Sequence, residues 1–245
     1  MADARQHYAG LLADVYLWSV SRRGDPFARA AAWLAAHGLD GAATYLDLGA
    51  GFGAHALPLA QAGKQVTAVD FDPTLLAALR TAATRAGVAI EVAEGDLGAF
   101  VAAAAGRRWD VIVCAGDTLT HLPAMADAAA LIAAAAARLA PGGALALEWR
   151  DSTEFTAEGV ARFVEVGRDA RRLMHCLLEP IDADHLRVTD LVTEVGPDGP
   201  TARISDYLKL RLSPSRVAAW ATAAGLRVAP ARVERGMTTL VARAP

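Results

Sequence analysis

Three glycines and one acid lie close together in the first quarter of the chain, in the run Ala-Thr-Tyr-Leu-Asp-Leu-Gly-Ala-Gly-Phe-Gly at 43–53. A short apolar segment ends at Asp47 and passes directly into Gly49 and Gly51. Because glycine has no Cβ, the backbone can turn tightly there and come close to a bound molecule. The spacing predicts a site for a small nucleoside-type ligand at the C-terminal end of a central strand.

The acid at position 47 distinguishes between two such ligands. Gly49, Gly51 and Ala54 also satisfy the looser dinucleotide-binding pattern, and Asp70 follows at about the spacing of a ribose-binding acid. A carboxylate beside the turn repels a pyrophosphate, whereas S-adenosyl-L-methionine has no phosphate and carries an ammonium and a sulfonium. Asp47 therefore favours S-adenosyl-L-methionine over a nicotinamide dinucleotide, and argues against a nicotinamide-dependent oxidoreductase.

The run at 43–53 resembles the signature loop of class I S-adenosyl-L-methionine-dependent methyltransferases. The resemblance implies S-adenosyl-L-methionine as cofactor and S-adenosyl-L-homocysteine as product. It also implies a Rossmann-like methyltransferase fold, an α/β fold with a doubly wound, seven-stranded and mostly parallel sheet that ends in a reversed hairpin.

The order of apolar segments agrees with this fold class. Short apolar strands alternate with helices as far as Arg150, which is typical of a parallel sheet covered on both faces. The following segments are consecutive strands, which predicts an antiparallel β insertion after the fifth strand. The expected strands are 43–48, 65–70, 88–93, 109–115, 143–149, 160–166, 171–179, 185–195, 201–212, 226–233 and 237–243. The expected helices are 3–18, 26–37, 53–62, 73–86, 96–104, 125–139 and 214–224.

These segments divide the chain into four predicted parts. Residues 1–40 are N-terminal helices that cover the site, and residues 41–150 are the cofactor-binding core. Residues 151–212 are the antiparallel insertion or lid. Residues 213–245 are a helix and hairpin that complete the core sheet.

Composition limits the class of protein. At 245 residues and 54% hydrophobic, the chain can form one large packed domain with a modest elaboration. A net charge of −3 gives no reason to expect nucleic-acid binding. The longest apolar stretch, 124–137, contains Asp127 and is too short for a membrane span, and the N-terminus lacks a signal-peptide core. The two cysteines have no metal-ligand spacing. We expect a cytoplasmic protein without a bound metal.

Acids follow each of the first three strands, where ligands of doubly wound sheets bind. Asp70 is expected to accept hydrogen bonds from both ribose hydroxyls, although it could also cap a helix before Pro73. Asp96 is expected at the adenine amino group, although its setting also suits a helix cap. The predicted cofactor-binding residues are Tyr8, Asp47, Gly49, Ala50, Gly51, Asp70, Phe71, Asp96, Leu97 and Ala115.

The segment after the fourth strand carries the candidates for substrate chemistry. Its Gly-Asp-Thr-Leu-Thr-His-Leu-Pro run resembles the Gly-Asn-Ser-x-x-His-Leu-Pro stretch of glycine N-methyltransferases and related small-amine methyltransferases. The resemblance places His121 on the histidine and Asp117 on the asparagine of that stretch. It implies that His121 relays a proton and that Asp117 holds the substrate nitrogen, while simple packing of His121 on the turn is an equal alternative.

Arg150 ends the fifth strand, in a segment that resembles the Asp-His-Arg-Asn-Tyr segment of the same family. The resemblance implies that Arg150 binds a substrate carboxylate, and a guanidinium is well suited to such a bidentate pairing. The alternative is a salt bridge to Asp151 or Glu154. Tyr8 and Tyr16 lie on the first helix, which in this family folds over the site, although their spacing also suits core packing. The predicted catalytic residues are His121, Asp117, Arg150 and Tyr16.

These observations predict a methyltransferase that N-methylates a small amine or amino acid by direct displacement. The substrate is expected to be an amine with an anionic group, with neither nucleic acid nor membrane as partner, and the chain could form a homo-oligomer. A small-molecule O-methyltransferase is one alternative, and it needs a base more stringently. A catalytically silent methyltransferase-like binding protein is a second.

Overall fold

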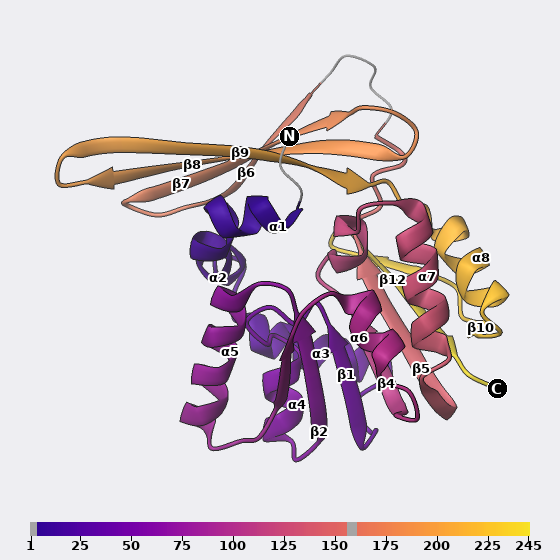
Figure 1. Ribbon diagram of the computed structural model, residues 1–245. Coiled ribbons are helices and arrows are strands. Elements are labelled where there is room, and N and C mark those ends of the chain that lie inside the picture. Colours follow the sequence, from indigo (N-terminus) through magenta and orange to yellow (C-terminus); the bar gives the residue numbers. More distant parts are fainter. Residues whose placement is uncertain (1–3, 156–160) are drawn as a thin grey trace.

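The computed structural model describes residues 4–155 and 161–245, and a mixed sheet forms its core (Figure 1). The strand order is β10-β12-β5-β4-β1-β2-β3, and β11 also pairs with β12. Strands β1 to β5 are parallel, whereas β12 runs antiparallel to β5 and β10, so the predicted fold class is confirmed. The strands are β1 (Thr44–Leu48), β2 (Gln65–Asp70), β3 (Glu91–Glu94), β4 (Trp109–Cys114), β5 (Leu139–Trp149), β10 (Arg227–Val228), β11 (Arg232–Glu234) and β12 (Met237–Arg243).

Helices cover both faces of this sheet, because alternate residues of its buried strands point to opposite sides. In β1, Leu46 and Leu48 pack in the cluster on one face, whereas Tyr45 packs in the cluster on the other. The first face is covered by α6 (Leu97–Ala103), α7 (Met125–Ala136) and α8 (Pro214–Ala223). The second is covered by α3 (Pro26–Ala36), α4 (Ala56–Gln61) and α5 (Pro73–Ala86).

Acids that follow the strands also begin the next helices. Asp72 precedes α5 and accepts a hydrogen bond from the Leu75 N–H at 2.9 Å. Asp96 precedes α6 and accepts one from the Ala99 N–H at 2.9 Å. Such caps satisfy N–H groups that have no partner inside the helix, so they fix where each strand ends and each helix begins.

The insertion is a separate four-stranded antiparallel sheet in the order β6-β7-β8-β9. Figure 1 shows it above the core, with the N-terminal helices beneath it. Residues of those helices, such as Tyr8 and Val15, pack with Leu75 of α5 and with Met174 and Val192 of the insertion. The elements are β6 (Arg162–Arg168), β7 (Arg172–Pro180), β8 (His185–Gly196), β9 (Gly199–Leu210), α1 (Ala4–His7), the π-helical turn η1 (Tyr8–Leu12) and α2 (Ala13–Ser21).

Several boundaries differ from the sequence expectation. The helix expected at 125–139 ends at Ala136, and the following strand begins at Leu139, which pairs with Trp109 across a register shift. The strand expected at 226–233 is split into β10 and β11 around Pro230, which has no N–H to donate to a ladder. The first residue of the strand expected at 160–166 lies outside the described residues, as does the start of the helix expected at 3–18.

Among the described helices, none has the length and apolar character needed to cross a membrane.

Candidate active site

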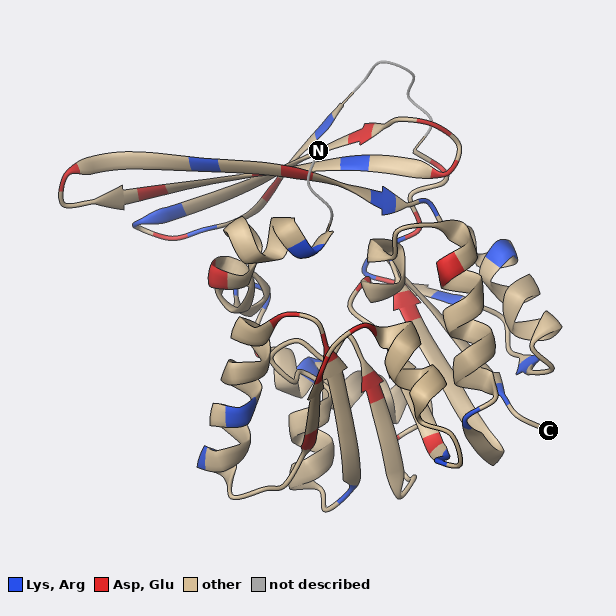
Figure 2. Ribbon diagram, viewed as in Figure 1, with Lys and Arg blue, Asp and Glu red and all other residues tan. Residues whose placement is uncertain are grey.

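A cavity of about 290 Å³ lies at the carboxyl ends of the core strands and under the N-terminal helices. Figure 2 shows acidic segments gathered along this edge of the sheet. Of the predicted site residues, Asp47, Asp117 and Arg150 are not among those that line the cavity. The predicted residues that line it are Tyr8, Tyr16, Gly49, Ala50, Gly51, Asp70, Phe71, Asp96, Leu97, Ala115 and His121.

The glycine loop after β1 is tied to the neighbouring strand β2. The N–H groups of Gly49 and Ala50 donate to the Val69 carbonyl at 2.8 and 3.0 Å. Gly49 has a φ of +76°, and a Cβ there would lie 2.3 Å from Thr118 Oγ1. Only glycine suits a left-handed conformation in so small a space, which explains the residue type at this position.

Asp70 lies at the end of β2, is 7% exposed and faces the cavity. Its Oδ2 accepts the Gly51 N–H at 2.8 Å and its Oδ1 accepts the Asp72 N–H at 2.9 Å. Burial raises the pKa of Asp70, while these N–H bonds oppose the shift. Asp70 therefore holds the glycine loop to β2, and the cap of α5 that the sequence offered as its alternative role is filled by Asp72.

Asp47 lies beneath the loop and is 2% exposed. Its Oδ2 has no hydrogen-bond partner among the described residues. Burial, and then the charge of Asp70, raise the pKa of Asp47 to about 7. A hydrogen bond from the Ala56 backbone opposes this rise. The structure thus places Asp47 behind the lining of the cavity.

Phe71, Asp96 and Leu97 line the far end of the cavity, at the ends of β2 and β3. The carboxylate of Asp96 caps α6 and also pairs with Arg5 at 3.3 Å. The Arg5 guanidinium lies over the Phe71 ring, 5.2 Å from its centroid. An aromatic ring, an aliphatic side chain and hydrogen-bonding acids together form surroundings suited to an adenine and its ribose.

These residues fit S-adenosyl-L-methionine. The glycine loop leaves room for close approach, and Asp70 presents a carboxylate to the cavity for ribose hydroxyls. Phe71 and Leu97 offer apolar surface to a base. Asp70 in the lining, with Asp47 behind it, suits a ligand that carries an ammonium and a sulfonium.

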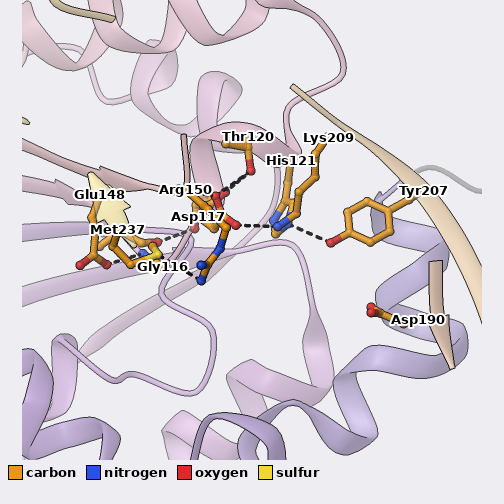
Figure 3. A network of polar contacts seen from close by, with 12 residues as sticks. Gly116, Asp117, Thr120, His121, Glu148, Arg150, Asp190, Tyr207, Lys209 and Met237 are labelled. Atoms are coloured by element: carbon orange, nitrogen blue, oxygen red, sulfur yellow. Dashed lines mark hydrogen bonds and ion pairs between the residues drawn. The ribbon is translucent and has the colours of Figure 1, made fainter. Parts of the chain in front are cut away.

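The turn after β4 is built around Asp117, which has a left-handed φ of +79° (Figure 3). Its Oδ2 pairs with Lys209 Nζ of β9 at 2.6 Å, and its Oδ1 accepts the Arg150 N–H at 2.9 Å. Although burial opposes ionisation, the charge of Lys209 holds the pKa of Asp117 well below its usual range. The carboxylate predicted to hold the substrate nitrogen is therefore already neutralised by a lysine of the insertion.

His121 ends the 3₁₀ turn η2 (Thr118–His121) and lines the cavity. Its Nε2 lies 3.3 Å from the Tyr207 hydroxyl of β9. Burial, and then the charge of Lys209, lower the pKa of His121 to about 3. The imidazole is therefore neutral at physiological pH, which limits its capacity to take up the proton that the sequence assigned to it.

A buried contact joins the first helix to the same strand. His7, on α1, is fully buried and approaches Asp190 Oδ2 and Ser205 Oγ, both at 2.9 Å. Its ring stacks on Tyr207 with centroids 4.3 Å apart. These contacts place the next residue, Tyr8, against the cavity, where its ring lies 5.8 Å from that of His121.

Tyr16 lies on α2 and also faces the cavity. Burial, and then the charge of Asp117, raise the pKa of Tyr16 to about 12. Burial likewise raises the pKa of Tyr8 well above its ordinary value. Both hydroxyls therefore keep their protons at neutral pH and can donate hydrogen bonds into the cavity.

Arg150 follows β5 outside the cavity lining. Its backbone N–H binds Asp117, and its guanidinium reaches the Met237 sulfur at 3.4 Å. Within the described residues it has no ion pair, so the salt bridge to Asp151 or Glu154 does not form. A guanidinium without a carboxylate partner remains available to a ligand.

The sequence reasoning missed Lys209, Tyr207 and Glu148. The first two lie on β9, from which they reach His121 and Asp117 in the turn after β4. Polar and apolar residues alternate along this strand, but the alternation alone does not specify which face is buried. Glu148 lines the cavity at the end of β5, two residues before Arg150.

Sequence comparison supports the assignment of the core. Residues 46–143 match the family described as methyltransferase domain. A cypemycin N-terminal methyltransferase from Streptomyces sp. is 36% identical over 154 residues, which cover 61% of this chain and 60% of that protein. A ubiquinone biosynthesis O-methyltransferase from Methylobacterium sp. (strain 4-46) is 35% identical over 100 residues, covering 41% of this chain and 38% of that protein. The chain thus spans less than two thirds of the length of each of these relatives.

Solved structures share the fold over nearly the whole chain. CalS10, described as an amino pentose methyltransferase from Micromonospora echinaspora, has a TM-score of 0.78 and 24% identity, covering 94% of this chain and 97% of that one. DesVI from Streptomyces venezuelae has a TM-score of 0.77 and 23% identity, covering 95% of this chain and 98% of that one. At such identities the likeness shows the fold alone. The two comparisons agree: residues 46–143 match a methyltransferase domain, and the chain shares its fold with solved methyltransferases.

Proposed function

We propose that the protein methylates the amine nitrogen of a small molecule. The observation that carries this proposal is the setting of His121, which is partly buried in the cavity wall with its Nε2 3.3 Å from the Tyr207 hydroxyl, so that its pKa is lowered. A hydroxyl must lose its proton to a base during methyl transfer, whereas a neutral amine already carries a free electron pair. A histidine that resists protonation is a poor base, so the cavity suits an amine better than a hydroxyl.

The residues of the chain mainly bind, orient and exclude water. S-adenosyl-L-methionine, when bound, supplies a methyl group that its sulfonium has already activated for direct displacement. An alkyl ammonium has a pKa of about 10 in water, and burial in the cavity favours its neutral form. The protonated hydroxyl of Tyr16 and the neutral ring of His121 can hold the nitrogen by hydrogen bonds. Alignment in a cavity with little water then supplies most of the rate.

A cluster of arginines beside the cavity supports an anionic group on the substrate. Arg29 lines the cavity and donates to backbone carbonyls, among them that of Arg23 at 2.8 Å. Burial, then the charges of Arg150 and Arg29, lower the pKa of Arg23. Among the described residues none of the three has a carboxylate partner, so an anion of the substrate would relieve their mutual repulsion.

The comparisons support an amine substrate by analogy. One curated relative is named an N-terminal methyltransferase, and one structural neighbour an amino pentose methyltransferase. The finer resemblance to glycine N-methyltransferases stays a prediction that rests on the turn after β4 and on Arg150. An O-methyltransferase is the second candidate, because other curated relatives are named ubiquinone biosynthesis O-methyltransferases.

Screening small molecules for S-adenosyl-L-homocysteine release tests the proposal. The panel should pair amines with the matching alcohols, with and without a carboxylate or phosphate, and mass spectrometry should locate the added methyl. We expect transfer to nitrogen in compounds that carry an anionic group. Transfer to the alcohols alone would favour the O-methyltransferase instead.

Substitution of Arg150 tests the anionic group. Arg150→Ala should raise the substrate KM roughly ten- to hundredfold, the effect of losing a charge-assisted hydrogen bond, with unchanged cofactor affinity. Arg150→Lys should recover little, because an ammonium lacks the planar fork of the guanidinium. Arg85→Ala, in the last turn of α5, is the control and should behave as the wild type. Normal kinetics in Arg150→Ala would contradict the anionic-substrate part of the proposal.

A further inference from the structure

Three carboxylates line the cavity among the described residues, those of Asp70, Asp96 and Glu148. Two of them are engaged at the cofactor end. Both oxygens of Asp70 accept backbone N–H groups, and Asp96 caps α6 while pairing with Arg5. Glu148 is different in its position and in its partners.

Among the described residues, one hydrogen bond involves the Glu148 side chain, from the Gly116 N–H to Oε2 at 3.2 Å. No cation lies within ion-pair distance of it in the described part of the chain, although the charges of His37 and Arg150 oppose the rise in its pKa. The nearby Asp117 is the more obvious choice for a cationic substrate, but Lys209 already occupies it at 2.6 Å. Of the carboxylates at the substrate end, Glu148 is thus the one with an oxygen free to bind a ligand.

The order of the strands places Glu148 away from the cofactor. The nucleoside-binding acids follow β2 and β3, whereas β5 lies on the other side of β4. Across the cavity from the sheet, Trp33 of α3 and Tyr16 of α2 line the wall. The Trp33 indole donates to Thr239, which is the strand partner of Glu148. Glu148 and Trp33 thus lie beside the same pair of strands, where an alkyl ammonium could meet a carboxylate and an aromatic face.

We propose that Glu148 is the specificity-determining residue that binds the amine-bearing part of the substrate. This inference rests on the proposed N-methyltransferase function. A partly buried carboxylate without a cationic partner is costly, and burial raises the pKa of Glu148 accordingly. A substrate ammonium, or an amine that donates its N–H, would satisfy the free oxygen, whereas a group without a donor or charge would leave it unpaired.

Binding of a simple amine can test Glu148 without any turnover. Ethanolamine and its uncharged counterpart ethylene glycol would be titrated into the complex with S-adenosyl-L-homocysteine, and their affinities measured by saturation-transfer NMR. We expect the wild type to bind ethanolamine about tenfold more tightly than ethylene glycol, the usual preference for a charge-assisted hydrogen bond. Glu148→Gln keeps an acceptor for Gly116 but loses the charge, and should remove this preference.

Two controls separate the possible outcomes. Glu94→Gln, at the exposed end of β3, should keep the wild-type preference. Calorimetric affinity for S-adenosyl-L-homocysteine should be the same in the wild type and in Glu148→Gln. A loss of that affinity in Glu148→Gln would assign the residue to the cofactor and overturn the inference, as would an unchanged preference or no binding of ethanolamine by the wild type.

The experiments distinguish failure of the inference from failure of the proposed function. If Glu148 selects ethanolamine but no amine is ever methylated, the proposed function fails, and only the binding of an amine by Glu148 stands. If an amine substrate is found and its KM is the same in Glu148→Gln, the function holds and the inference fails. With a true amine substrate we expect its KM in Glu148→Gln to rise by about tenfold or more.

Discussion

The ion pair between Asp117 and Lys209 should show strong energetic coupling. Its two side chains are 13% and 17% exposed and their charged atoms lie 2.6 Å apart, so the pair is largely desolvated. Removing one partner leaves the other charge buried and uncompensated, which typically costs 3–5 kcal/mol of unfolding free energy. Because some exposure remains, we expect about 3 kcal/mol for Lys209→Met and for Asp117→Asn taken singly.

The double variant should lose less unfolding free energy than the sum of the losses in the two single variants. Asparagine tolerates the left-handed φ of position 117, and its Oδ1 can still accept the Arg150 N–H. With both charges gone, neither is buried without a partner, so the double variant should lose no more than about 3 kcal/mol. The coupling free energy is then at least about 3 kcal/mol. This ion pair also explains why position 117 is an aspartate, where the similar stretch of glycine N-methyltransferases has asparagine.

Urea unfolding of the wild type, both single variants and the double variant gives the required cycle. The exposed pair Arg107–Glu91, whose side chains are 44% and 52% exposed, is the matched control. Its cycle should give less than about 1 kcal/mol. If the losses of unfolding free energy at Asp117 and Lys209 add within about 0.5 kcal/mol, the two charges do not stabilise each other and the reasoning is refuted.

Further predictions concern the cofactor loop and the cavity. The pKa of Asp47, about 7, exceeds that of an unfolded aspartate, so ionisation destabilises the fold as pH rises. Asp47→Asn should therefore be more stable than the wild type by about 2–4 kcal/mol near pH 8, a gain that urea unfolding should show vanishing below about pH 4. Gly49→Ala would bring a Cβ to 2.3 Å from Thr118 and should weaken S-adenosyl-L-homocysteine binding in calorimetry by about tenfold or more. Gly63→Ala controls for backbone strain, since Gly63 has a φ of +78° and open space around it. With a pKa of about 3, His121 should stay neutral in an NMR titration from about pH 8 to 5, and an inflection near 6.5 would contradict the lowered pKa.

Local pattern was enough to predict the core and to predict that several of the candidate cofactor-binding residues lie together. A parallel sheet brings the carboxyl ends of its strands to one edge, so a residue there is placed by its position in the strand alone. Gly49, Asp70 and Asp96 could be assigned in this way, and the structure brings all three to one cavity. Boundaries near glycine and proline were less predictable, because pairing with a distant strand decides them, as Leu139 with Trp109 shows.

The substrate end depended on contacts between distant segments. Lys209 lies 92 residues from Asp117, and His7 lies 183 residues from Asp190. Polar and apolar residues alternate along β9, but only the docking of the insertion over the core placed Tyr207 beside His121.

The sequence by itself thus determined the fold class and the cofactor loop, because strand period and glycine conformation are properties of a few neighbouring residues. The tertiary structure alone decided which charges are neutralised. It pairs Asp117 with Lys209 and leaves Glu148 and Arg150 without a counter-ion among the described residues. The physical reason is that the free energy of a charge depends on its burial and on its partners in space, which spacing along the chain does not specify.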